Sequence, residues 1–142
     1  MRFIYILLAV IGMMQTSGCG EDEQVLTPNE VTEEHLTSQI WEMTEVKIDD
    51  VVSDLYAGLT LSFGSKTYTT IHGGKVWPAS GSWEFVGDKG DKILRDDGLQ
   101  ITIESANASQ LVMSFTWSST TFDGGRVGSL TGMHRMTFKR KT

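Results

Sequence analysis

Cysteine and proline are scarce in this sequence. Its 142 residues include one cysteine, Cys19, and two prolines, Pro28 and Pro78. Because a lone cysteine forms no intramolecular disulfide, the fold has to be stabilised by an apolar core. Positive charge is scarce too, since 12 Lys and Arg residues accompany 18 Asp and Glu residues and the net charge is −6. Binding to nucleic acid depends on neutralising phosphates, so nucleic acid is not an expected partner.

The apolar segment at the start of the chain is too short to span a membrane. The uncharged run from Phe3 to Met14 would reach about 18 Å as a helix, against about 30 Å for the hydrocarbon core of a bilayer. Arg2 precedes this run and the small residues Thr16-Ser17-Gly18 follow it, which is the layout of a secretory signal peptide. We therefore expect residues 1–18 to be a cleaved signal.

The end of this segment, Thr16-Ser17-Gly18-Cys19, resembles a bacterial lipobox, although Thr16 departs from the usual leucine-like residue. The resemblance implies that Cys19 is acylated, becomes the mature N-terminus and anchors the protein to the outer membrane. The acidic run that follows, within residues 19–35, has two interpretations. It is a solvated tether, or it is similar to the export signal that sends some Gram-negative lipoproteins to the cell surface. A periplasmic and a surface-exposed location therefore both stay open.

The mature chain begins with a helix signal and continues with strand signals. Thr27-Pro28-Asn29-Glu30 has the form of a capping box with proline at the first helical position, which predicts a short helix near 29–37. From Ser38 onward apolar and polar residues alternate, as in strands with one buried face. Turns rich in glycine and aspartate separate these segments. Strands are predicted at 39–48, 58–63, 66–72, 80–86, 91–95, 99–104, 110–122 and 126–139.

Strands joined by tight turns are antiparallel neighbours in a meander. Such a sheet has to close on itself or stack on a second sheet, because open edges and a bare apolar face are costly. Hairpin connections favour an up-and-down barrel over a Greek-key sandwich, which needs a long crossing connection. The sequence therefore predicts an all-β protein, a small antiparallel up-and-down barrel of about eight strands in residues 36–142 with a short N-terminal helix.

Several segments, in their order along the chain, resemble the lipocalin-like domain of small lipoproteins from Gram-negative bacteria. They are Gly58-Leu59-Thr60-Leu61-Ser62-Phe63, Tyr68-Thr69-Thr70, the run from Val76 to Phe85, Leu94-Arg95-Asp96-Asp97-Gly98, Ser114-Phe115-Thr116-Trp117, Asp123-Gly124-Gly125-Arg126 and Met136-Thr137-Phe138. The resemblance covers about residues 36–142 and implies an antiparallel barrel with a small-molecule cavity, carried on a lipid tether.

True lipocalins differ from this chain at their first strand. They carry a Gly-x-Trp signature there, and this chain has Trp41 with Gln39 in place of the glycine. In lipocalins a late arginine covers that tryptophan, and the resemblance implies this role for Arg135 or Arg140.

Aromatic residues supply the candidate ligand site. Trp83 and Trp117 are in phase with the apolar faces of their strands and are expected inside the barrel, whereas Trp77 precedes Pro78 in a loop and is expected at the barrel mouth. Such residues form either a packed core or the wall of a pocket, and both interpretations stay open. The candidate apolar lining is Trp77, Trp83, Phe85, Phe115 and Trp117, with Tyr68 and Arg135 as polar contacts.

Motifs for bond-breaking chemistry are weak in this sequence. The imidazoles are His35, His72 and His134, without a Gly-x-Ser-x-Gly motif or a pair at zinc-ligand spacing. The aspartate clusters do not follow EF-hand spacing and are typical of turns. We therefore expect no enzymatic activity, metal or cofactor. The predicted function is an envelope lipoprotein that binds or carries a small, largely apolar molecule. The alternative is an adaptor with a filled barrel that binds another envelope protein through its surface.

Overall fold

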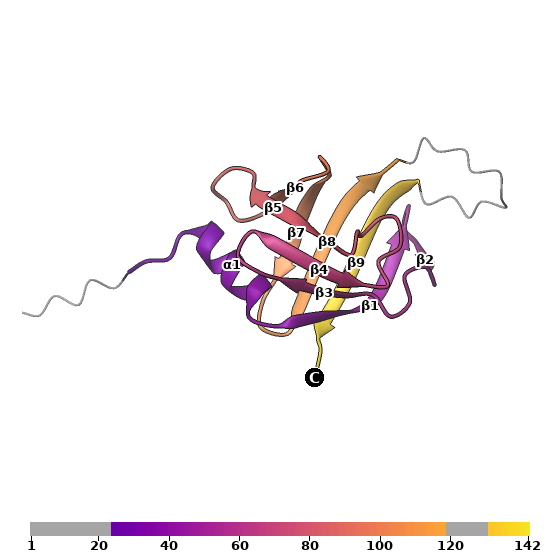
Figure 1. The fold of residues 1–142 in the computed structure, drawn as a ribbon, viewed down its shortest axis with the longest axis horizontal. Coiled ribbons are helices and arrows are strands. Elements are labelled where there is room, and N and C mark those ends of the chain that lie inside the picture. The colour runs from indigo at the N-terminus through magenta and orange to yellow at the C-terminus, as the bar shows by residue number, and fades with distance from the viewer. Residues whose placement is uncertain (1–23, 119–130) are drawn as a thin grey trace, which may run out of the picture.

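The computed structural model describes residues 24–118 and 131–142, which form one helix and nine strands (Figure 1). The helix is α1 (Pro28–Thr37). The strands are β1 (Ile40–Ile48), β2 (Val51–Ser53), β3 (Thr60–Phe63), β4 (Thr67–Ile71), β5 (Ser80–Phe85), β6 (Lys92–Arg95), β7 (Gln100–Ala106), β8 (Gln110–Trp117) and β9 (Gly132–Arg140). The expected signal peptide, Cys19, the turn at 123–125 and the predicted strand residues 119–122 and 126–130 lie outside the described residues.

The predicted all-β barrel is confirmed. The strands follow the order β2-β1-β3-β4-β5-β6-β7-β8-β9, every pair is antiparallel, and β1 also pairs with β9. The β1–β9 ladder runs from Trp41 opposite Arg140 to Ile48 opposite His134 and closes eight strands into a barrel. A register shift between Met43 and Glu45 marks a β-bulge, a feature that bends a strand and so helps the sheet to close.

Strand β2 is an addition that the sequence analysis did not predict. The first half of β1 pairs with β3, whereas Val46–Ile48 pairs with β2 through the two-residue turn Asp49-Asp50. Both aspartates have positive φ, 49° and 65°, as a type I′ hairpin turn requires. β2 therefore extends beyond the eight barrel strands as a short edge.

The predicted helix and its capping box are confirmed. The Thr27 hydroxyl accepts from the Glu30 amide at 3.3 Å, and the Glu30 carboxylate accepts from the Thr27 amide at 2.7 Å. Leu36 is buried, and its carbonyl accepts from the Trp41 indole at 3.2 Å. The helix therefore packs across one end of the barrel.

The alternation of inward and outward side chains is also confirmed. On β8, Leu111, Met113 and Phe115 are buried, and on β9 the buried side chains are His134, Met136 and Phe138. Buried aromatic and aliphatic side chains from the barrel strands meet in one cluster. The interior of the barrel is therefore largely filled by the protein itself.

Candidate functional site

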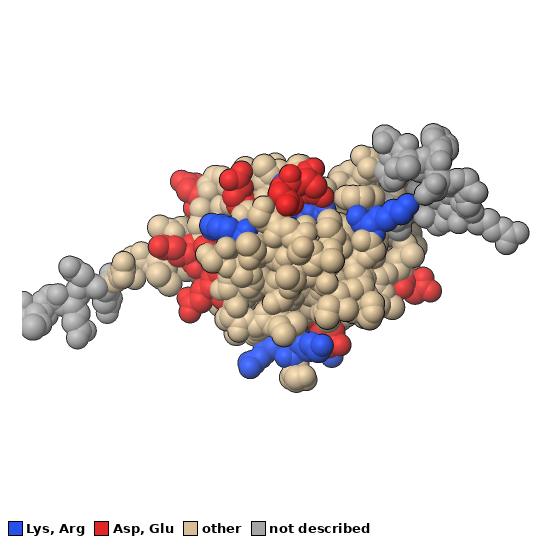
Figure 2. Space-filling view, in the orientation of Figure 1, with Lys and Arg blue, Asp and Glu red and all other residues tan. Residues whose placement is uncertain are grey.

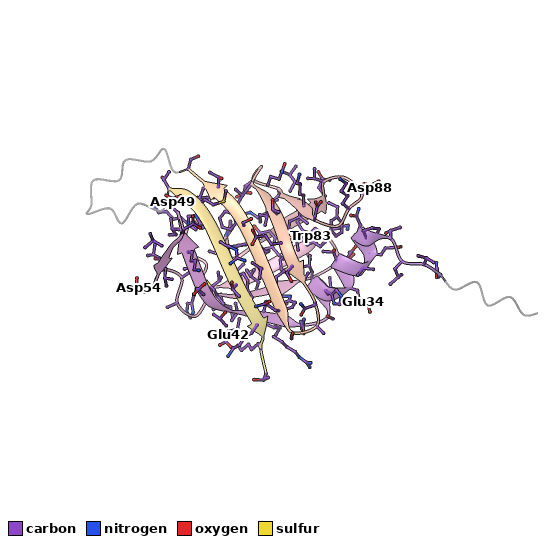
Figure 3. The ribbon with its side chains drawn as sticks, turned by 180° about the vertical axis from the view of Figure 1, so that it is seen from behind. Glu34, Glu42, Asp49, Asp54, Trp83 and Asp88 are labelled. Atoms are coloured by element: carbon purple, nitrogen blue, oxygen red, sulfur yellow. The ribbon has the colours of Figure 1, made fainter. Side chains whose placement is uncertain are left out.

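The two ends of the barrel are built differently. The helix end carries α1 and the turns 64–66, 86–91 and 107–109, and the loop end carries the turns 49–50, 54–59, 72–79 and 96–99. Figure 3 shows Glu34 and Asp88 at the helix end and Asp49 and Asp54 at the loop end. The candidate site lies inside the barrel toward the loop end.

Residues 72–79, here called the plug loop, fold into the barrel. The Trp77 amide donates to the Gly73 carbonyl at 3.0 Å, and the Thr70 hydroxyl lies 3.2 Å from the Trp77 carbonyl and 2.8 Å from the Pro78 carbonyl. A Cβ on Gly73 would lie 2.3 Å from the Trp77 carbonyl oxygen, so this tight turn requires glycine.

The expectation that Trp77 sits at the barrel mouth is wrong, because its side chain is buried inside with 1% exposure. Its indole lies edge-on to Tyr68 of β4, with centroids 5.7 Å apart, and to Phe115 of β8 at 6.1 Å. Its Nε1 is 3.4 Å from the Met136 sulfur of β9. Contacts with strands from different sides of the barrel show that the indole occupies the interior.

Arg95 of β6 holds the plug loop in place. The residue is 2% exposed, and its guanidinium carbon lies 4.9 Å from the centre of the Trp77 ring. Its Nη1 donates to the Val76 carbonyl at 2.7 Å, its Nε donates to Asp97 Oδ1 at 3.0 Å, and its Nη2 pairs with Asp97 Oδ2. The hydrogen bond from Arg95 holds the pKa of the Asp97 carboxyl below its usual range. One buried cation thus joins the plug loop to the turn between β6 and β7.

Arg95 is absent from the site residues predicted from the sequence, although a signal for it is present. Arg95 follows Ile93 by two residues, and both side chains are buried on the inner face of β6. A charged residue in phase with an apolar face marks a buried cation, which requires partners.

Arg135, by contrast, does not join the candidate site. It is exposed on β9 between the buried His134 and Met136, and its Nε donates to the Glu104 carboxylate at 2.7 Å. The expectation that Arg135 supplies an inward polar contact is therefore wrong. Arg140 is exposed opposite Trp41 in the β1–β9 register.

Trp83 and Phe85 form a separate pair near the helix end. Trp83 is buried, its ring centroid lies 5.0 Å from that of Phe85, and its indole donates to the Thr67 carbonyl at 3.0 Å. The Lys66 ammonium lies 4.6 Å from the Trp83 ring and 4.5 Å from the Phe85 ring, and it pairs with Glu33 of α1 at 3.0 Å. The structure therefore brings Tyr68, Trp77 and Phe115 together, whereas Trp83, opposite Arg95 in the β5–β6 register, and Phe85 contact Lys66 toward the helix end.

Two buried polar atoms, the Tyr68 hydroxyl and Trp117 Nε1, have no hydrogen-bond partner among residues 24–118 and 131–142. Tyr68 is 2% exposed, and burial raises the pKa of its hydroxyl. A Cβ on Gly81, which faces Tyr68 across the β4–β5 ladder, would lie 2.5 Å from this hydroxyl. Buried polar groups normally find partners, so the Tyr68 hydroxyl is a hydrogen-bonding group that no described residue satisfies.

His134 and Tyr56 form a second polar contact at the loop end. The His134 ring stacks on Phe115 at 5.2 Å and its Nδ1 lies 3.1 Å from the Gly132 carbonyl, so Nδ1 carries the hydrogen. Nε2 is 3.5 Å from the Tyr56 hydroxyl. Burial lowers the pKa of His134 and raises the pKa of Tyr56 to about 12, so both groups are neutral at pH 7.

Comparison with known proteins gives no match to a family model, a curated protein or a solved structure. In the described part of the chain, no helix is long and apolar enough to cross a bilayer. The same residues contain no group of three His, Cys, Asp or Glu side chains placed to hold a metal ion. The residues of the barrel itself are therefore the basis for any functional assignment.

Proposed function

We propose that this protein is an envelope lipoprotein, anchored to the outer membrane through lipid on Cys19, whose lipocalin-like barrel binds or carries a small, largely apolar molecule. The molecule takes the space that the Trp77 indole fills. The observation that carries this proposal is the unequal closure of the two barrel ends. Among the described residues, one end is tied shut by a helix, and the other is closed by loops, of which the plug loop inserts the Trp77 ring into the barrel.

Several independent contacts close the helix end of the barrel. The Asn29 side chain donates to the Gly87 carbonyl at 3.0 Å and accepts from the Gly90 amide at 2.8 Å, and the Thr32 hydroxyl donates to the Gly90 carbonyl at 2.8 Å. Lys66 and Glu33 add an ion pair between α1 and the turn at 64–66. Opening this end would break all of these contacts, so the helix end is the end of the barrel that stays closed.

At the loop end, the plug loop closes the barrel through contacts that a ligand could make in its place. Trp77 contributes the ring, and Val76 contributes a carbonyl to Arg95. Burying an indole removes about 150–250 Å² from water, which stabilises the closed state by about 4–6 kcal/mol. A guest with a ring of similar size buries a similar area, so exchange of Trp77 for the guest is nearly neutral in apolar burial. Polar contacts then decide whether the guest binds.

A fluorescent apolar probe tests the proposal. The full chain carrying Cys19→Ser, which lacks the acylated side chain, would be titrated with N-phenyl-1-naphthylamine while the probe emission is recorded. We expect saturable binding, and at least tenfold tighter binding by Trp77→Ala, because this variant removes the ring that competes with the probe. Native mass spectrometry of the protein purified from its host should also show a bound small molecule.

Trp41→Ala is the matched control, since Trp41 is fully buried and its indole donates to the Leu36 carbonyl of α1 at the helix end. An equal gain in Trp41→Ala would show that the probe enters any loosened core rather than a site beside the plug loop. Absence of probe binding by the starting protein and by Trp77→Ala would contradict the proposal. Thermal unfolding of each variant verifies that the barrel is still folded.

The second candidate function is an adaptor that binds an envelope protein through its surface. The filled interior favours it, as does the outer face over β3 and β4, which Figure 2 shows as largely free of charge. Exposed residues on the outer face of β4 and β5 include Thr67, Thr69, Ile71, Ser80 and Ser82. Cross-linking in intact cells that recovers one partner, together with a ligand-free mass, would favour the adaptor.

A further inference from the structure

The plug loop presents two chemical groups to the barrel as one unit. The Val76 carbonyl accepts from Arg95 Nη1 at 2.7 Å, and the Trp77 indole packs against Tyr68, Phe115 and the same guanidinium. Three atoms of the chain, the Trp77 nitrogen, Cα and Cβ, separate that carbonyl carbon from the ring. The segment therefore has the shape of a flat aromatic molecule with an oxygen acceptor on a three-atom linker.

The guanidinium of Arg95 has more N–H donors than the plug loop and Asp97 use. Asp97 occupies the Nε and Nη2 side, and Val76 accepts one bond from Nη1. Of the five N–H groups of a guanidinium, these contacts use three, so one on Nη1 and one on Nη2 are left over. An ionised acceptor forms a shorter and stronger bond with a buried cation than a neutral carbonyl does.

The Tyr68 hydroxyl is a second buried donor, on a ring that neighbours Arg95. It has no hydrogen-bond partner among the described residues, and its ring lies 5.9 Å from the Arg95 guanidinium carbon. Both side chains border the Trp77 ring, at 5.7 Å for Tyr68 and 4.9 Å for Arg95. Two donors beside one ring-shaped space suit a carboxylate, whose two oxygens accept from both.

We infer that the barrel binds a flat aromatic carboxylate, whose ring replaces Trp77 and whose carboxylate replaces the Val76 carbonyl on Arg95 and also accepts from Tyr68. This inference rests on the proposed function and adds the chemical class of the ligand. The Asp97 carboxylate does not occupy the position assigned to the ligand, since it binds the opposite side of the guanidinium and is 37% exposed. It orients Arg95 and leaves the Nη1 side for the ligand.

The test compares two ligands that differ only in the acceptor group. Indole-3-butyrate has a three-atom linker between its ring and its carboxylate, and its primary amide is the neutral counterpart. Each would be titrated into the full Cys19→Ser chain by calorimetry and by displacement of N-phenyl-1-naphthylamine. We expect the carboxylate to bind at least tenfold more tightly than the amide.

Tyr68→Phe supplies the decisive variant because it removes only the unpartnered hydroxyl. Its affinity for the carboxylate should fall about tenfold, which is the loss of one hydrogen bond to a charged group. Its stability should be unchanged or higher, since a buried donor without a partner is removed. Tyr56→Phe is the matched control, because the Tyr56 hydroxyl faces His134 instead of Arg95, and its preference for the carboxylate should be unchanged.

The outcomes separate this inference from the proposed function. Equal binding of carboxylate and amide, with the naphthylamine probe still bound, overturns the ligand class while the small-molecule function stands. An unchanged affinity of Tyr68→Phe for the carboxylate overturns the two-donor site. If neither indole compound nor the probe binds, both the inference and the proposed function are overturned.

Discussion

The ion pair between Arg95 and Asp97 should control how firmly the plug loop is held. Asp97→Asn keeps the size of the side chain and removes its charge, which leaves Arg95 buried with only neutral acceptors, the new amide oxygen and the Val76 carbonyl, among the described residues. A hydrogen bond to a charged group contributes about 1.5–3 kcal/mol. Because Asp97 is 37% exposed and solvent screens the pair, we expect a loss of about 1–2 kcal/mol in the free energy of unfolding at pH 7.

The pH dependence of this loss gives a sharper test. The pKa of Asp97 is lowered in the folded state, so its contribution is present above the unfolded-state pKa of about 3.9 and disappears as the pH falls through the folded-state value. Urea unfolding followed by tryptophan emission at pH 7 and near pH 2 measures this change. The difference between Asp97→Asn and the unsubstituted chain should shrink in acid.

Asp96→Asn is the control, since Asp96 is the exposed neighbour in the same turn. Asp96→Asn should lower the free energy of unfolding by less than Asp97→Asn does, and its effect should not change between pH 7 and acid in the way expected for Asp97→Asn. An equal loss in both variants, or a loss for Asp97→Asn that is the same at both pH values, would refute the assignment of Asp97 as the anchor of Arg95.

Three further predictions concern other parts of the molecule. Gly73→Ala places a Cβ 2.3 Å from the Trp77 carbonyl oxygen, so overpacking should lower the free energy of unfolding, measured in urea, by about 1–3 kcal/mol and increase binding of the naphthylamine probe. Cys19→Ser should abolish incorporation of labelled palmitate in cells and release the protein from the membrane fraction, whereas retained labelling would place the lipid elsewhere. Burial lowers the pKa of His134 below 6.5, so the unfolded state takes up a proton first and stability should decrease as the pH falls below about 6.5. His134→Phe should remove this slope, and comparison of urea midpoints at pH 7 and pH 5 measures it.

The strand pattern was predictable because it depends on local alternation. Inward residues such as Leu111, Met113 and Phe115 are large and apolar, and their outward neighbours are mostly polar, so the phase can be read without coordinates. β2 lacks this signal, since Val51 and Val52 are 69% and 63% exposed and the strand exists through its pairing with β1. The position of such an edge strand is determined by the strand with which it pairs.

The candidate site was only partly predictable. The phase of β9 placed Met136 and Phe138 inward, and the same alternation places Arg135 outward on the strand. The position of Trp77 had no comparable local signal, because Gly73 and Pro78 indicate a loop without indicating whether it turns inward. Burial of the indole depends on Tyr68, Phe115 and Met136, which come from three different strands. Tertiary packing, rather than local sequence, decided that part of the site.

The ladder between β1 and β9 has a consequence for the order in which this protein folds. It joins the first strand after the helix to the last strand of the chain, from Trp41 opposite Arg140 to Ile48 opposite His134. Contacts between such distant parts of a sequence form slowly, because a long loop has to be closed before they form. During synthesis, β1 therefore keeps one unpaired edge until β9 emerges, and a chain truncated before β9 would expose edges on β1 and β8 to other extended chains.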